Sequence, residues 1–321
     1  MSRLQELFDQ HGQSPWLDNL RRGWISSGEL QVLIDRGVRG ITSNPSIFQK
    51  AMTGTDDYDE QLSALAGAGR SIEDSYWELV TRDIVDALDL LRPVHKATDG
   101  LDGFVSVEVD PSLAADTGGT EAAARHLSRI IDRPNLFVKI PATAEGIPAI
   151  RTMIGEGCSV NVTLIFSLNR YEDVMEAYIA GLEAHEGDLS GTSSVASFFI
   201  SRTDTEIDRR LDAVGTPEAL ALRGRAAVAQ GQVAYDLFRR AFSGPRWEAL
   251  VARGARVQRP LWASTSTKNP AYPDTLYVDA LIGPDTVNTL PEATLEAFDE
   301  HGTLARTVDA DPEGARATLA A

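Results

Sequence analysis

The sequence predicts an α/β fold: a single (β/α)8 barrel of the TIM type with additional helices, formed by residues 1–321 as one domain. Short apolar segments typical of strands alternate along the chain with longer segments of helical periodicity. This repeated order favours parallel strand pairing with right-handed crossovers. Eight strand-like segments favour a closed barrel over an open sheet. The nucleotide-binding signatures G-x-G-x-x-G and G-x-x-x-x-G-K-[ST] are both absent from the sequence.

The elements follow one another without a Pro/Ser-rich linker or a low-complexity tract that would separate two domains. The first predicted strand has the weakest pattern, and the others are short apolar runs; in order they are residues 15–20, 37–42, 103–109, 135–140, 159–166, 193–200, 257–264 and 275–282. Segments with apolar residues at helical spacing predict helices at residues 71–91, 120–131, 169–184, 216–242 and 291–301. In residues 303–321 the pattern predicts only a short helix that starts late.

Composition limits the partners of the chain. Lys and Arg number 30 against 47 Asp and Glu, giving a formal net charge of −17. Such a charge repels polyanions and argues against nucleic-acid or acidic-membrane partners, so an anionic substrate would need a local cluster of donors. No signal-like opening and no run of 18 apolar residues is present, and we expect a soluble cytoplasmic protein. The single cysteine allows no internal disulfide, and a monomer and a homodimer are both compatible with the sequence.

Two charged residues interrupt predicted strands. Lys139 lies among Phe137, Val138 and Ile140, where burial disfavours the charged ammonium and favours a nucleophilic neutral amine. Glu108 lies near the end of the neighbouring strand along the chain. The pair could form a structural ion pair, or both could be catalytic. In a barrel the chemistry concentrates at the C-terminal ends of the strands.

Other polar candidates lie on the following strands. Asn161 and Thr163 are two residues apart and share a strand face, as do Ser197 and Phe199. Barrels often bind phosphate in the loops after the seventh and eighth strands. The remaining candidates lie at the end of the sixth strand or after the seventh, where a solvated polar loop is the alternative to a phosphate site: Arg202, Ser264, Ser266 and Lys268. The five histidines are too scattered for a metal site, and we expect none.

Four segments together resemble the transaldolase family, a family of class I Schiff-base aldolases. They are G-I-T-S-N-P-S-I-F at residues 40–48, V-S-V-E-V-D-P at 105–111, F-V-K-I-P-A-T at 137–143 and N-V-T-L-I-F-S at 161–167. W-L-D-N-L at residues 16–20 and L-W-A-S-T-S-T-K-N-P at 261–270 are similar to the longer bacterial branch. The resemblance covers Pro15 to about His301.

The resemblance implies a transferase of the pentose phosphate pathway in which Lys139 forms a Schiff base with a ketose phosphate. Asp18 would act as general acid/base at the C3–C4 bond, and Glu108 and Thr163 would hold a water for proton transfer. Asn44 and Asn161 would bind hydroxyl groups of the dihydroxyacetone unit in a pocket also lined by Thr42 and Ser197. The phosphate would bind Arg202, Ser264 and Lys268. An imine stabilises the enamine left by C–C cleavage, so no metal or organic cofactor is needed.

Several alternatives stay open from the sequence. Asp18 could cap a helix instead of serving catalysis, and the alignment of the loop around Lys268 could shift by a residue or two. A C-terminal helix that closes over the barrel mouth in the longer branch is expected to be absent or shortened here. The rival activities are a simple aldolase such as a fructose 6-phosphate aldolase, a pyridoxal phosphate enzyme, and an inactive sugar-phosphate-binding barrel.

Overall fold

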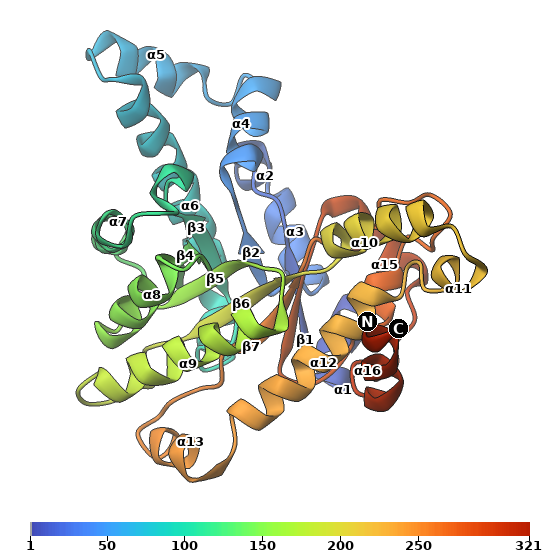
Figure 1. Ribbon diagram of the computed structural model, residues 1–321. Coiled ribbons are helices and arrows are strands. Elements are labelled where there is room, and N and C mark those ends of the chain that lie inside the picture. Colours follow the sequence, from blue (N-terminus) through green and yellow to red (C-terminus); the bar gives the residue numbers. More distant parts are fainter. Residues whose placement is uncertain (1) are drawn as a thin grey trace.

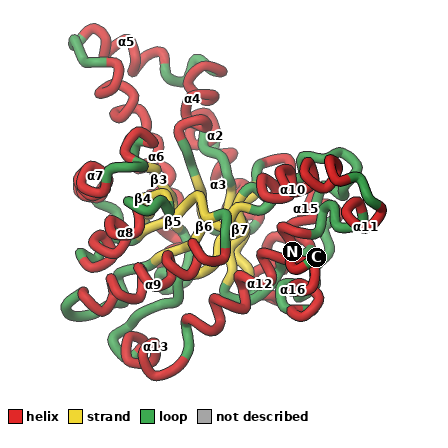
Figure 2. Tube along the Cα trace, viewed as in Figure 1, coloured by secondary structure: helices red, strands yellow, loops and turns green. Residues whose placement is uncertain are grey.

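The computed structural model describes residues 2–321 and contains a closed barrel of parallel strands surrounded by helices (Figures 1 and 2). The strands pair in chain order, and β8 closes the barrel against β1. They are β1 (Gln13–Leu17), β2 (Gly40–Thr42), β3 (Phe104–Glu108), β4 (Leu136–Pro141), β5 (Val160–Ile165), β6 (Ser194–Phe199), β7 (Arg259–Ala263) and β8 (Thr286–Leu290). The predicted fold class is confirmed.

Helices form the outer layer. They are α1 (Arg3–His11), α2 (Arg22–Ser27), α3 (Glu29–Arg36), α4 (Pro45–Gly54), α5 (Asp59–Gly67), α6 (Ile72–Ala97), α7 (Thr117–Ile131), α8 (Gly146–Gly155), α9 (Leu168–Ala184), α10 (Ser201–Val214), α11 (Pro217–Leu220), α12 (Ala226–Ala241), α13 (Gly244–Val251), α14 (Leu276–Asp279), α15 (Glu292–His301) and α16 (Pro312–Ala320), with a 3₁₀ turn at Pro111–Leu113. Among the helices of residues 2–321, none combines the length and the apolar character needed to cross a membrane.

The prediction of the eighth strand was wrong in its position. Residues 275–282 hold the short helix α14, and the strand that closes the barrel is Thr286–Leu290. Tyr277, Val278, Leu281 and Ile282 are all buried, a spacing that fits one face of a helical turn as well as a buried strand. The true strand, T-V-N-T-L, contains three polar residues and so lacks the continuous apolar pattern.

Two helix predictions also change. The predicted helix 216–242 is divided into α11 and α12 by a turn that includes Gly224 at φ +71°. The helix predicted at 71–91 continues to Ala97, with Pro93 inside it. The last helix, α16, packs against α12 through Ala315, Ala229 and Val233, in the outer layer of the barrel.

Large aromatic side chains fill the barrel interior below the site. Phe104 and Phe137 stack with ring centroids 4.1 Å apart, and Trp16 lies 6.1 Å from Phe137. Gly40 makes room for the indole, because a Cβ atom there would come within 2.5 Å of the Trp16 ring. Phe137 and Lys139 are two residues apart on β4 and therefore share the interior face. The aromatic layer thus forms the floor beneath Lys139.

Helices α4, α5 and the first part of α6 project away from the barrel as an arm (Figure 1). Asn44 begins this arm by capping α4, since its side-chain oxygen accepts a hydrogen bond from the Ile47 backbone N–H, and Pro45 occupies the first turn. The arm therefore starts directly at the end of β2, at the rim where the strands end.

Candidate active site

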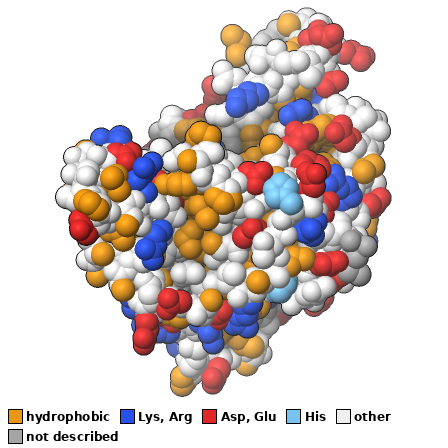
Figure 3. Space-filling view, turned by 90° about the vertical axis from the view of Figure 1, so that its right-hand side faces the viewer, with side chains coloured by type: hydrophobic (Ala, Val, Ile, Leu, Met, Phe, Trp, Pro, Cys, Tyr) orange, Lys and Arg blue, Asp and Glu red, His pale blue; other side chains and the backbone are white. Residues whose placement is uncertain are grey.

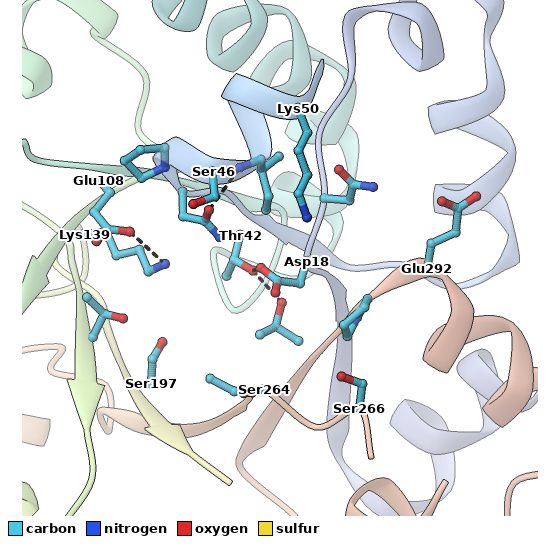
Figure 4. Close-up of a pocket in the computed structure, with 18 of the residues that line it drawn as sticks. Asp18, Thr42, Ser46, Lys50, Glu108, Lys139, Ser197, Ser264, Ser266 and Glu292 are labelled. Carbon is cyan, nitrogen blue, oxygen red and sulfur yellow. Dashed lines mark hydrogen bonds and ion pairs between the residues drawn. The ribbon is translucent and has the colours of Figure 1, made fainter. Parts of the chain in front are cut away.

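A cavity of about 820 Å³ opens at the C-terminal ends of the strands. Its lining includes every residue that the sequence proposed for the site except Asn161. Figure 4 shows side chains from β2, β3, β4, β6 and the segment after β7 converging on this cavity. The predicted residues are therefore brought together by the barrel, although they lie up to some 250 residues apart in sequence (Asp18 and Lys268).

Lys139 and Glu108 form an ion pair at the wall of the cavity. Their positions on β4 and β3 are in register, and Lys139 Nζ lies 3.1 Å from Glu108 Oε2. Lys139 is only 7% exposed, and its ammonium also donates to the Ser43 carbonyl oxygen at 3.3 Å. The ion pair considered from the sequence is thus present. Both side chains still face the cavity, so the pair remains accessible to a ligand (Figure 4).

Asp18 lies immediately after β1, where its backbone N–H donates to the Leu290 carbonyl at 2.8 Å. It does not cap a helix, because the N-cap residue of α2 is Arg21. Its carboxylate accepts a hydrogen bond from the Thr42 hydroxyl at 2.7 Å, and Thr42 also contacts the Thr289 hydroxyl at 2.6 Å. These contacts hold the carboxylate at the cavity wall with capacity to accept further hydrogen bonds.

The two asparagines lie differently with respect to the cavity. Asn161 is fully buried behind the cavity wall, where its amide donates to Ser106 Oγ at 3.0 Å and its oxygen accepts from Ser197 Oγ at 2.7 Å. It orients Ser197, which does line the cavity. Asn44 also lines the cavity, but its oxygen is engaged in capping α4.

Strand β5 is irregular at the site. Its register with β6 shifts between Val162 and Ile165, and Leu164 adopts φ +61°, a conformation that is rare for a branched side chain. As a result, the adjacent residues Thr163 and Leu164 both line the cavity, which a regular strand would not allow. Leu164 was not predicted, because nothing in the run S-V-N-V-T-L-I-F marks a bulge.

Arg202, Ser266 and Lys268 line the cavity from the segments that follow β6 and β7. Arg202 follows β6 in the first turn of α10, with its guanidinium carbon 5.0 Å from the centre of the Phe199 ring. The Lys268 ammonium donates to Ser266 Oγ at 2.6 Å. Ser264, at φ +56°, turns the chain out of β7, and its hydroxyl lies 2.9 Å from that of Ser201. The first turn of α10 and the loop after β7 are thus adjacent, as the sequence predicted.

Comparison with known proteins agrees with this geometry. Residues 15–321 match the family described as transaldolase/fructose-6-phosphate aldolase. The chain belongs to the transaldolase family. It is 55% identical to a protein named transaldolase 2 of Streptomyces avermitilis, over 99% of this chain and 87% of that protein. A transaldolase of Parafrankia sp. is 54% identical over 96% of this chain and 85% of its own length, and one of Thermobifida fusca is 54% identical over 99% and 88%.

Similarity of this extent, over the whole barrel, identifies the chain as a transaldolase, a transferase of carbohydrate metabolism. Its fold is the one expected from the resemblance. The barrel supplies the rigid scaffold, and the strand ends and following loops supply the polar groups.

The balance of charge at the cavity is opposite in sign to that of the whole transaldolase chain. The whole chain has a formal net charge of −17, yet the cavity is lined by five basic and three acidic side chains. Acidic and basic groups are intermixed over the face shown in Figure 3. A sugar phosphate is therefore attracted locally by the site, which is the arrangement that the composition required.

The sequence missed part of the basic lining. Arg21 and Lys50 both line the cavity, and Lys50 extends into it from α4 toward the side of Asp18 (Figure 4). Residues 47, 50, 51 and 54 all line the cavity and follow helical spacing, so the periodicity of α4 could have indicated this face. Within residues 2–321, no group of three or more His, Cys, Asp and Glu side chains is arranged to hold a metal ion.

Proposed function

We propose that this transaldolase transfers a dihydroxyacetone unit from fructose 6-phosphate or sedoheptulose 7-phosphate to glyceraldehyde 3-phosphate or erythrose 4-phosphate, through a Schiff base on Lys139. The observation that carries the proposal is the Lys139–Glu108 pair, 3.1 Å apart, at the wall of a cavity that is also lined by Arg202 and Lys268. A buried amine, a proton-transfer group and an anion site are the parts that this reaction requires.

In the first half-reaction, the neutral Lys139 amine attacks the C2 carbonyl of the donor to give a carbinolamine. Transfer of a proton to the departing hydroxyl releases water and leaves the protonated imine. Glu108 accepts the ammonium proton and returns it to the leaving hydroxyl, with Thr163 orienting a water between them. The distance of 3.1 Å between Glu108 and the Lys139 amine supports direct transfer of the first proton, and the departing hydroxyl forms on the carbon bonded to the same amine.

C–C cleavage then uses Asp18. Its carboxylate removes the proton of the C4 hydroxyl, the C3–C4 bond breaks, and the electron pair moves into the protonated imine to form a neutral enamine. The aldose phosphate leaves, and the enamine adds through C3 to the acceptor aldehyde while Asp18 returns the proton. Water then hydrolyses the regenerated protonated imine, which releases the product ketose phosphate and restores the Lys139 amine. The hydrogen bond from Thr42 to Asp18 orients the carboxylate for both directions.

The substrate phosphate is assigned to Arg202, Ser264, Ser266 and Lys268. Guanidinium and ammonium groups form charge-assisted hydrogen bonds to phosphate oxygens. Both cations come from segments that follow adjacent strands, β6 and β7, so they border one part of the rim. Asn44 and Ser197 are assigned to donor hydroxyl groups, and Asn161 supports Ser197 from behind.

The test is product analysis with fructose 6-phosphate, with and without erythrose 4-phosphate. Transfer predicts sedoheptulose 7-phosphate and glyceraldehyde 3-phosphate in equal amounts, little turnover without the acceptor, and no accumulation of free dihydroxyacetone. The family also includes fructose 6-phosphate aldolases by its description, and steady release of dihydroxyacetone without an acceptor would identify that activity instead. Lys139→Ala is the matched control for background reaction.

A further inference from the structure

Two tyrosines connect the loop after β7 to helix α10. The Tyr272 hydroxyl donates to Asp208 Oδ2 at 2.5 Å, and the Tyr277 hydroxyl donates to Asp204 Oδ2 at 2.9 Å. Asp204 and Asp208 are four residues apart and therefore lie on the same face of α10. These bonds join the two segments that carry the proposed phosphate-binding cations: Lys268 lies four residues before Tyr272, and Arg202 lies in the first turn of α10.

Each carboxylate also binds the chain that follows α10. Asp208 Oδ1 accepts from the Gly224 N–H at 2.9 Å, and Asp204 Oδ1 accepts from the Ala227 N–H at 2.8 Å. Asp208 is 8% exposed and Asp204 1% exposed, and burial raises the pKa of Asp204. In the part of the chain that the structure describes, neither carboxylate has an ion-pair partner. Their hydrogen-bond donors therefore carry the stabilisation that a buried carboxylate needs.

Packing fixes the Tyr272 ring as well. Gly224 has φ +71°, and a Cβ atom there would come within 2.9 Å of Tyr272 Cζ. The ring thus lies against a backbone position that admits only glycine, while its hydroxyl shares Asp208 with the same glycine's N–H. The position of Tyr272 is defined by both the ring and the hydroxyl.

Lys268, by contrast, is exposed. Among residues 2–321 its ammonium forms a hydrogen bond only to Ser266, on the same loop. A turn follows at once, in which the Asn269 carbonyl accepts from the Tyr272 N–H at 3.1 Å. The position of the ammonium is therefore set by the loop, and the loop is held through Tyr272.

We propose that Tyr272 and Asp208 form a latch that positions Lys268 opposite Arg202, so that Tyr272 is a positioning residue for the phosphate of the substrate. The inference rests on the proposed phosphate site. Its consequence is specific: loosening the latch weakens phosphate binding and leaves the chemistry at Lys139 unchanged, because Tyr272 and Asp208 do not line the cavity.

The test is Tyr272→Phe, which removes one hydroxyl and keeps the ring against Gly224. Steady-state rates are measured with fructose 6-phosphate and with fructose as donor, using unphosphorylated erythrose as acceptor in both cases, so that each reaction forms sedoheptulose. We expect KM for fructose 6-phosphate to rise about three- to tenfold, part of the effect of a hydrogen bond to a charged acceptor, with kcat and the fructose reaction unchanged. The inhibition constant of inorganic phosphate should rise by the same factor.

Three further variants sharpen the test. Asp208→Asn keeps an oxygen that can accept from Tyr272, so its effect on KM should be smaller than that of Asp208→Ala. In a Lys268→Ala background Tyr272→Phe should have no further effect on KM, because the two changes act through one contact. Tyr178→Phe is the matched control, since that hydroxyl donates to the Arg256 carbonyl at 2.8 Å, away from the cavity.

The outcomes separate the two proposals. If Lys268→Ala weakens phosphate binding and Tyr272→Phe leaves it unchanged, the latch is wrong and the phosphate site stands. Equal effects of Tyr272→Phe on both donors, or additive effects with Lys268→Ala, also overturn the latch. If Lys268→Ala itself leaves the preference for fructose 6-phosphate intact, the phosphate site and the latch are both overturned.

Discussion

The two ends of the barrel each contain buried acidic and basic groups. At one end their hydrogen-bonding capacity is fully used, and at the other part of it remains free. Near the N-terminal ends of the strands, Asp102 is fully buried and accepts hydrogen bonds from Arg39 and Arg259 at 2.8 and 2.9 Å. Ser14 and Trp16 complete its shell at 2.8 and 3.2 Å. At the C-terminal ends, Lys139 and Glu108 pair at 3.1 Å beside an open cavity.

The difference shows how a fold separates stability from chemistry. Both carboxylate oxygens of Asp102 accept hydrogen bonds from donors on β1, on β7 and at the residue before β2, so the group is fixed and closed to ligands. The Lys139–Glu108 pair retains unused donor and acceptor capacity toward the cavity. Position along the strand and free bonding capacity, more than burial itself, distinguish the two sets of charges.

The largest effect is expected at Lys139. Lys139→Ala removes the nucleophile and should lower kcat/KM by about 10⁴-fold or more, the scale for loss of a group that forms the covalent intermediate. The melting temperature should change much less than the activity, because the carboxylate of Glu108 faces the open cavity and stays within reach of water when its partner is removed. Rates with fructose 6-phosphate and thermal unfolding measure both. A stable variant that keeps more than a hundredth of the activity would show that Lys139 is not the nucleophile, and the contrast between the two ends of the barrel would fail.

The opposite pattern is expected at the other end of the barrel. Asp102→Asn leaves Arg259 and Arg39 without their carboxylate and should reduce the free energy of unfolding by about 3–5 kcal/mol, the range for breaking a buried ion pair. The folded fraction should retain the kcat of the unaltered enzyme. Denaturant unfolding and assays at a temperature where the variant is folded give the two values. Loss of kcat without loss of stability would contradict the structural role.

Glu108→Gln tests the active pair from its acidic side. The amide keeps the shape but cannot accept a proton, so turnover should slow by about 10²-fold, within the usual range for general acid–base groups. The KM for fructose 6-phosphate should stay nearly constant. If the variant instead unfolds more readily and retains its kcat, Glu108 would be a structural partner of Lys139 and the two ends of the barrel would be alike.

A smaller effect, which depends on whether the substrate is phosphorylated, is expected at the proposed phosphate site. Arg202→Ala and Lys268→Ala should each weaken the binding of phosphorylated donors by about 1.5–3 kcal/mol, the value of a hydrogen bond to a charged group. Reactions of unphosphorylated fructose should hardly change. The ratio of kcat/KM for fructose 6-phosphate and fructose isolates this contribution. An equal loss with both donors would assign these residues to support of the barrel.

The smallest effect concerns acid stability. Burial raises the pKa of Asp102, but Arg259 and Arg39 outweigh it, and the net pKa is lowered below the usual value. The carboxylate therefore stabilises the fold above the unfolded pKa of about 3.9, and this contribution disappears as the pH falls through the lower folded pKa. Unfolding free energy measured between about pH 5 and pH 2 should fall less steeply in Asp102→Asn than in the parent. Identical slopes would rule out this linkage.

Strand-level patterns allowed most of the site to be predicted. Lys139, Glu108, Thr163 and Ser197 interrupt apolar strands near their ends, and closure of the barrel brings such positions to one rim. Arg259 interrupts β7 in the same way, but at the first residue of the strand. Its place in the strand could have assigned it to the stabilising end.

Other features depend on tertiary structure that no local pattern encodes. The apolar run at residues 275–282 fits a strand and a buried helical turn equally well, and only packing against α10 through Tyr277 decides between them. The bulge that exposes Leu164 and the contacts that bury Asn161 behind Ser197 arise from the pairing of β5 with β6. The Tyr272–Asp208 hydrogen bond joins residues 64 positions apart.

The central claim is that the amine at the open end of the barrel forms the covalent bond to the donor. The direct measurement is borohydride reduction of the enzyme in the presence of fructose 6-phosphate, followed by mass spectrometry of the intact protein and its peptides. We predict one added dihydroxyacetone unit per chain, located on Lys139, and no adduct in Lys139→Ala. An adduct on Lys50 or Lys268, or no adduct during active turnover, would contradict the account.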